Sequence, residues 1–185
     1  MLPTASVYAV ALLAAFLLAW RGIARRIPTW QLAAHALLAL YVGWLIGATL
    51  FPLPLHHLAG DGGLGAALNH PNIVPFASIR ATLAENGVRP RVRLLGGNVL
   101  VFVPFGLLLP AIWPRLDGFW RMALAGVAVG VSIELTQLAV SLALGGWYRM
   151  SDVDDVILNT AGVLLGYGLW RTLGRSRRRR QEAVL

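Results

Sequence analysis

The chain has 185 residues, of which 57% are hydrophobic and only 13% are charged. A soluble domain carries about 25% charged residues, so this composition excludes an ordinary soluble protein and indicates an integral membrane protein. The net charge is +8, but every cationic residue is an arginine and most flank apolar runs, which is typical of topology signals rather than of nucleic-acid binding. The absence of cysteine excludes disulfides and thiolate chemistry.

Five apolar stretches predict an all-α polytopic transmembrane bundle of about five spans, because each is long enough to cross a bilayer. They cover residues 3–20, 31–51, 94–113, 119–144 and 153–170. One long connection, residues 52–93, is rich in proline and glycine, and its segment 77–85 is expected to form a short helix at the membrane interface. We therefore divide the chain into an N-terminal helix with a basic loop (1–30), a transmembrane domain (31–170) and a basic tail (171–185).

The distribution of arginine predicts the orientation of the bundle. The first apolar run has no basic residue before it, whereas Arg21, Arg25 and Arg26 follow it. This is the reverse of a cleavable signal peptide and favours a retained first span with its N-terminus outside. Placing the tail in the cytoplasm puts about eleven arginines inside and about five outside, four of them in the long loop, where charge counts less.

The few polar residues within the predicted spans are candidates for function, because ionisable groups in a membrane are costly. In the fourth stretch Glu134, Gln137 and Ser141 share one helical face, which Gly126 and Gly130 continue as a small-residue contact surface.

The fifth and third stretches repeat this pattern. In the fifth, Asp152, Asp155 and Asn159 lie on one stripe that continues through Gly162 and Gly166. In the third, Asn98 lies near the start. Below it, Pro104 is expected to kink the helix and free a carbonyl, and Gly106 follows.

The helical rise of 1.5 Å per residue places these groups in depth. Glu134 is expected roughly 15 Å below the outer end of its span, and Asp155 and Asn159 within roughly the first 10 Å of theirs. These positions predict a polar pocket that opens outward, with Glu134 at its floor and Arg149 at its rim.

Structural interpretations stand beside this functional one. Ser151-Asp152-Val153-Asp154 fits a capping box at a helix start, and Arg149 can pair with one of the acids. Glu134 can be a buried carboxylate bonded to Gln137 or Asn159, and the asparagines can form interhelical hydrogen bonds. The isolated histidines and the absence of ligand-spacing motifs predict no metal and no cofactor.

Three ordered motifs resemble the VanZ-like family of bacterial membrane proteins over about residues 36–170. They are Asn72-Ile73-Val74-Pro75-Phe76, then Asn98 followed by Pro104-Phe105-Gly106, and then Glu134-Leu135-Thr136-Gln137 followed by Arg149, Asp152, Asp155, Asn159, Thr160 and Gly162. The family is named after an accessory protein of glycopeptide resistance, associated with teicoplanin.

The resemblance implies a place in the bacterial cytoplasmic membrane. It supports one ligand-binding site made of Asn98, Glu134, Gln137, Arg149, Asp152, Asp155 and Asn159. The remaining motif residues, which are Asn72, Pro75, Phe76, Pro104, Phe105, Gly106 and Gly162, are expected to be structural.

The predicted function is to bind or handle a polar envelope ligand, such as a lipid headgroup, a lipid-linked cell-wall precursor or a glycopeptide. Membrane lipids are the expected partners, and nucleic acid is not. Arg149 would hold a phosphate or carboxylate, because a guanidinium presents a fork of donors. Two alternatives stay open: an intramembrane hydrolase or transferase with Glu134 as general base, and a transporter of lipids or small molecules.

Overall fold

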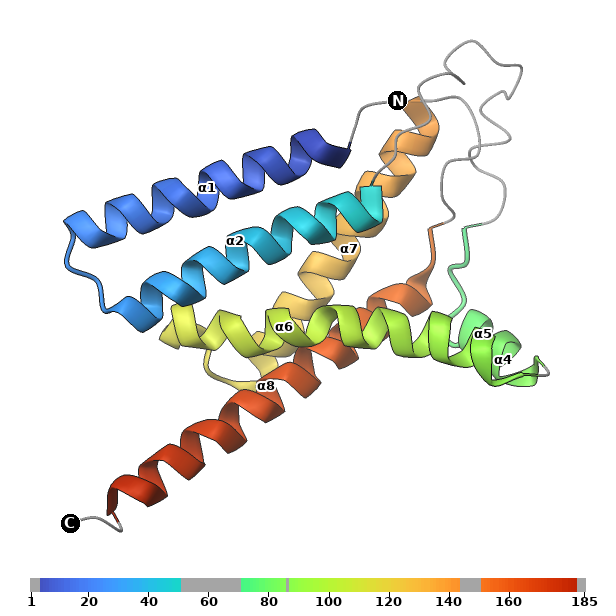
Figure 1. The fold of residues 1–185 in the computed structure, drawn as a ribbon. Helices are drawn as coiled ribbons and strands as arrows, with labels where there is room; N and C mark the ends of the chain where they lie inside the picture. Colours follow the sequence, from blue (N-terminus) through green and yellow to red (C-terminus); the bar gives the residue numbers. More distant parts are fainter. Residues whose placement is uncertain (1–3, 51–70, 86, 144–150, 183–185) are drawn as a thin grey trace.

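The computed structural model describes residues 4–50, 71–85, 87–143 and 151–182. Its described residues form helices and contain no strand, which confirms the all-α prediction (Figure 1). The elements are α1 (Thr4–Ala24), α2 (Thr29–Leu50), α4 (Ala77–Ala84), α5 (Val88–Arg91), the π-helical turn η2 (Val92–Gly96), α6 (Gly97–Ile112), the 3-10 turn η3 (Pro114–Leu116), α7 (Phe119–Ala143) and α8 (Val153–Glu182).

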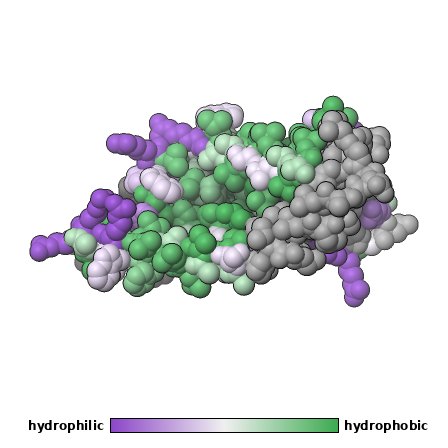
Figure 2. All heavy atoms as spheres, turned by 90° about the horizontal axis from the view of Figure 1, so that it is seen from above, coloured by the Kyte–Doolittle hydropathy of each residue, from purple (hydrophilic) through white to green (hydrophobic). Residues whose placement is uncertain are grey.

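Four helical segments are long and apolar enough to cross a membrane: Ala5–Ala24, Thr29–Leu50, Val92–Ile112 and Phe119–Ala143. The helix α8 is not among them. It carries Asp154 and Asp155 in its first turn and continues into the arginine-rich tail, so its apolar part is short. The fifth span therefore stays a prediction. Many large apolar side chains are exposed, and Figure 2 shows them over the middle of the molecule, with hydrophilic side chains mainly near its two ends.

The helices give the bundle two distinct ends. The start of α6 lies with α4 and α5 at one end, and the short connection that joins α6 to α7 lies at the other (Figure 1). We call the first of these the α4 end. The predicted short helix at 77–85 is present as α4, and polar residues of the sequence motifs surround it.

The core forms where α6, α7 and α8 meet. Phe102 of α6, Met122 of α7 and Val163 of α8 are almost completely buried, and α6 packs most extensively against α8. The α6 and α8 backbones touch through glycine: a Cβ on Gly162 would overlap the Val99 carbonyl oxygen, and one on Gly106 would overlap that of Val163. Only glycine permits such an approach.

Pro104 lies inside α6, as predicted, and the helix continues past it. Proline lacks the N–H that would close the preceding turn, so carbonyl groups in that turn need other donors. The Tyr41 hydroxyl of α2 donates to the Val101 carbonyl of this turn at 2.8 Å. This bond ties α2 to α6 beside the Leu100 carbonyl, which is the one that Pro104 leaves without its helical donor.

Candidate functional site

Polar side chains from several parts of the chain meet around the first turn of α8. Four of the eight acidic residues of the sequence belong to this cluster, namely Glu134, Asp152, Asp154 and Asp155. Two asparagines at or before helix starts join them: Asn72, before α4, and Asn98, in the first turn of α6. We call these six residues the polar junction.

Glu134 connects α7 to the residues that lead into α8. Its carboxylate Oε2 accepts hydrogen bonds from the Ser151 hydroxyl at 3.0 Å and from the Asp152 backbone N–H at 2.8 Å. The side chain is only 7% exposed. These donors differ from Gln137 and Asn159, which the sequence suggested as partners. The carboxylate therefore fixes the entry of the chain into α8.

The same contacts correct the expected order of depth. Glu134 lies level with Asp152, because its carboxylate bonds the backbone N–H of that residue. Asn159 comes seven residues later on α8, roughly 10 Å further along the helix by its rise per residue. The expectation that Glu134 forms the floor is therefore wrong. The prediction from helical rise assumed that the end of α7 and the start of α8 lie at the same level. In the structure α7 continues to Ala143, beyond the level at which α8 begins.

Asp152 caps its own helix and binds the segment before α4. Its Oδ1 accepts from the Asp154 backbone N–H at 2.8 Å and from the Asn72 amide at 2.8 Å. The Asn72 N–H donates to the Ser151 carbonyl, and the Val153 N–H donates to the Asn72 carbonyl. The predicted capping box, with Ser151 as the N-cap residue, is therefore wrong. The Ser151 hydroxyl donates to Glu134, and the N-cap residue of α8 is Asp152.

Asp154 has a structural function that the sequence reasoning missed. Its carboxylate is 1% exposed and accepts from the backbone N–H groups of Phe76 and Ile79, at 2.5 and 3.0 Å. These N–H groups begin α4, whose N-cap residue Phe76 has no side-chain acceptor and a φ of 67°. The sequence did contain a signal for this contact: the residue before the predicted helix 77–85 is Phe76, whose side chain cannot accept a hydrogen bond. The free N–H groups of the first helical turn therefore need an acceptor from another part of the chain.

Asn98 and Asp155 join α6 to α8, with the Asn98 amide donating to Asp155 Oδ1 at 2.5 Å. Asn159 lies one turn after Asp155 on the same stripe, which reaches Gly162. The Asn159 side chain is 5% exposed. It makes no hydrogen bond to another residue of the described ranges, and it is not sealed from solvent, since no fully enclosed polar atom in them lacks a partner.

Gln137 lies on the buried face of α7 together with Gly126, Gly130, Glu134 and Ser141, as the sequence predicted. Its amide donates to the Thr49 carbonyl at the end of α2, at 3.1 Å. This interhelical bond gives Gln137 a partner on α2, away from the α8 stripe. Arg149, the predicted rim residue, lies outside the described residues.

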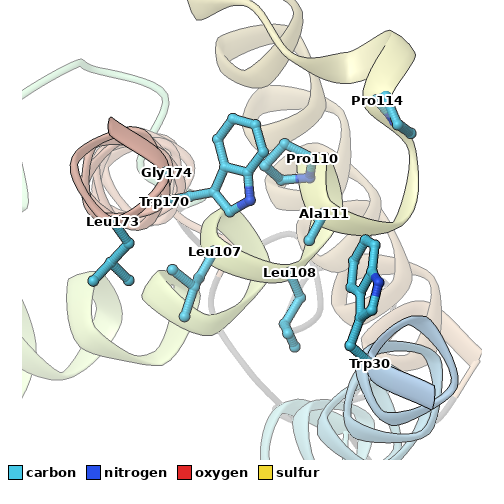
Figure 3. Close-up of a pocket in the computed structure, with 9 residues that line it drawn as sticks. All are labelled: Trp30, Leu107, Leu108, Pro110, Ala111, Pro114, Trp170, Leu173 and Gly174. Carbon is cyan, nitrogen blue, oxygen red and sulfur yellow. The ribbon is translucent and has the colours of Figure 1, made fainter. Parts of the chain in front are cut away.

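Two hollows lie elsewhere on the described surface. One, of about 490 Å³, is apolar and lies between Trp30 of α2, the end of α6 and Trp170 of α8 (Figure 3). The other, of about 860 Å³, lies along α5 and η2. The described ranges contain no group of three His, Cys, Asp or Glu side chains placed to hold a metal. A pocket at the polar junction stays a prediction.

Four helices that are long and apolar enough to cross a membrane define a polytopic α-helical membrane protein. The family model described as VanZ/LLP1 matches residues 38–174. The protein VanZ of Enterococcus faecium is 30% identical over 140 residues, which is 76% of this chain and 74% of that protein. The chain therefore belongs to the VanZ-like family. No solved structure matches it.

Proposed function

We propose that this chain binds the polar headgroup of a membrane lipid or of a lipid-linked cell-wall precursor beside the polar junction. The observation that supports the proposal is Asn159. The residue is 5% exposed and its amide has no hydrogen-bond partner among the described residues. The amide is not sealed from its surroundings, so its donor and acceptor groups are available to a ligand that enters beside α8.

The chemistry around Asn159 suits a ligand with hydroxyl or ammonium groups. The Asp155 carboxylate lies one turn before it and accepts from Asn98. Carboxylates accept hydrogen bonds from sugar hydroxyls and ammonium groups, while amides both donate and accept. Arg149, which precedes α8 in the sequence, would contact a phosphate. In cells this binding would alter exposed precursors or exclude a glycopeptide, in keeping with the family's association with resistance.

Replacing Asn159 by leucine tests the proposal, since leucine has a similar volume and no polar atoms. We expect about a tenfold or greater loss of affinity, because a site built to hydrogen-bond a ligand loses strongly when one partner is removed. Binding is measured on the full chain in nanodiscs, with a labelled lipid-linked precursor and with short-chain phosphatidylethanolamine. Thr160→Val is the matched control, because the Thr160 hydroxyl donates only within its own helix, to Val156.

Equal affinity of N159L and the unchanged chain for both probes would contradict the proposal. A cellular assay adds a second readout: N159L should lose any teicoplanin protection that the unchanged chain confers, at equal membrane level. Chelator-sensitive turnover of the precursor that disappears in Glu134→Gln would instead favour the enzyme alternative.

A further inference from the structure

The second hollow combines exposed apolar side chains with two arginines. Its lining consists of Val88 and Arg89 of α5 and Val92, Arg93 and Leu94 of η2. Val88 is 72% exposed, Val92 is 60% exposed and Leu94 is 50% exposed. Such exposure is unfavourable in water, because each apolar side chain leaves its surface hydrated. The hollow therefore requires an apolar environment on one side.

Neither arginine of the hollow has an acidic partner within the described ranges. The ion pair that the described ranges contain joins Arg171 to Asp117. It lies at the opposite end of the bundle from α5. Arg89 and Arg93 are four residues apart, about one helical turn, and both line the same hollow. The neighbouring Arg91 differs, because it donates to the Glu85 carbonyl.

We infer that this hollow binds an anionic phospholipid, with its phosphate between Arg89 and Arg93 and its acyl chain along Val88, Val92 and Leu94. A guanidinium matches the geometry of phosphate oxygens and is weakly hydrated, so it suits an interfacial anion. Apolar side chains beside cationic ones are typical of segments that lie in the membrane interface. The inference is independent of the ligand proposed for Asn159, since the two surfaces share no residue.

The lining favours a lipid over a soluble anion. A free phosphate would use the two arginines and leave the valines and the leucine in water. A phospholipid covers both kinds of group at once, and each arginine near an anionic membrane surface contributes a further electrostatic attraction. Charge and hydropathy thus point to the same occupant.

The test compares two pairs of substitutions with the same change in charge at the same end of the molecule. The first pair is Arg89→Gln with Arg93→Gln, and the control pair is Arg80→Gln with Arg91→Gln, which does not line the hollow. The full-length proteins are exchanged into micelles containing equal phosphatidylglycerol and phosphatidylcholine, and retained lipids are counted by native mass spectrometry.

We expect the unchanged chain and the control pair to retain phosphatidylglycerol preferentially, and the R89Q/R93Q protein to lose about tenfold in apparent affinity for it. Equal losses in both pairs would show diffuse electrostatic attraction and overturn the proposal, as would no loss in either. Displacement of phosphatidylglycerol by inorganic phosphate at constant ionic strength would assign the hollow to a soluble anion and would also overturn it. Circular dichroism of each variant checks that helix content is unchanged.

Discussion

The carboxylate of Asp154 accepts a hydrogen bond from the backbone N–H of Ile79 at 3.0 Å, across 75 residues of sequence. The first turn of one helix thereby supplies the cap of another. A negative charge at a helix N-terminus also interacts favourably with the helix dipole. Together with the Asn72–Asp152 pairing, this contact holds α4 against the start of α8.

Removing the Asp154 carboxylate should therefore loosen α4. We expect Asp154→Ala to reduce the free energy of unfolding by about 1–3 kcal/mol, because buried N–H groups lose their acceptor. Asp154→Asn should cost less, since its carbonyl still accepts one bond. Hydrogen exchange of the α4 amides and the thermal midpoint measure the effect.

The control for this prediction is Asp117→Asn, a half-exposed acid at the opposite end of the bundle. It should leave exchange in α4 unchanged. If α4 amides exchange at the same rate in D154A as in the unchanged chain, Asp154 does not hold the helix.

Asn98 and Asp155 should be energetically coupled, because they bond directly between α6 and α8. A double-mutant cycle of N98A, D155A and the combined variant isolates their interaction. We expect a coupling free energy of about 0.5–2 kcal/mol, the range for polar contacts between membrane helices. The change in the free energy of unfolding of each variant is measured in mixed micelles. Strictly additive changes would mean that the contact contributes nothing.

The close approach of α6 and α8 depends on Gly162. A methyl group there would overlap the Val99 carbonyl oxygen, so Gly162→Ala should force the helices apart and destabilise the protein by about 1–3 kcal/mol. Gly168 lies on the same helix, and a methyl group there would meet no atom within 4 Å. Gly168→Ala should be neutral or stabilise by up to about 1 kcal/mol through helix propensity. Thermal stability by size-exclusion chromatography compares them, and equal behaviour would refute the packing argument.

The orientation with an external N-terminus and a cytoplasmic tail predicts that the α4 end faces outward. The chain contains no cysteine, so single introduced cysteines report their side of the membrane without background. Arg80→Cys, at an exposed position of α4, should react with an impermeant maleimide in intact cells. Trp120→Cys, at the exposed start of α7, should react only after permeabilisation. The reverse labelling pattern would show that the predicted orientation is wrong and that the α4 end, with the polar junction, faces the cytoplasm.

The helical class, the apolar segments and the faces on which residues gather could all be predicted from the order of amino acids. Hydrophobic periodicity and residue size are local properties, so the buried face of α7 and the glycines of α8 followed from spacing alone. The polar residues were also recognised as a group, because polar atoms in apolar spans are exceptional.

The partner that each polar group takes depends on how the helices are placed against one another. Glu134 binds Ser151 and the Asp152 backbone, Gln137 binds Thr49, and Asp154 caps α4. Spacing along one helix gives direction but not the relative height of two helices. The start of α8 lies level with Glu134 and not with the end of α7. This offset decides which groups of the two helices come into contact. Asn159, rather than Glu134, is therefore the deeper residue, and its amide forms no hydrogen bond with another described residue.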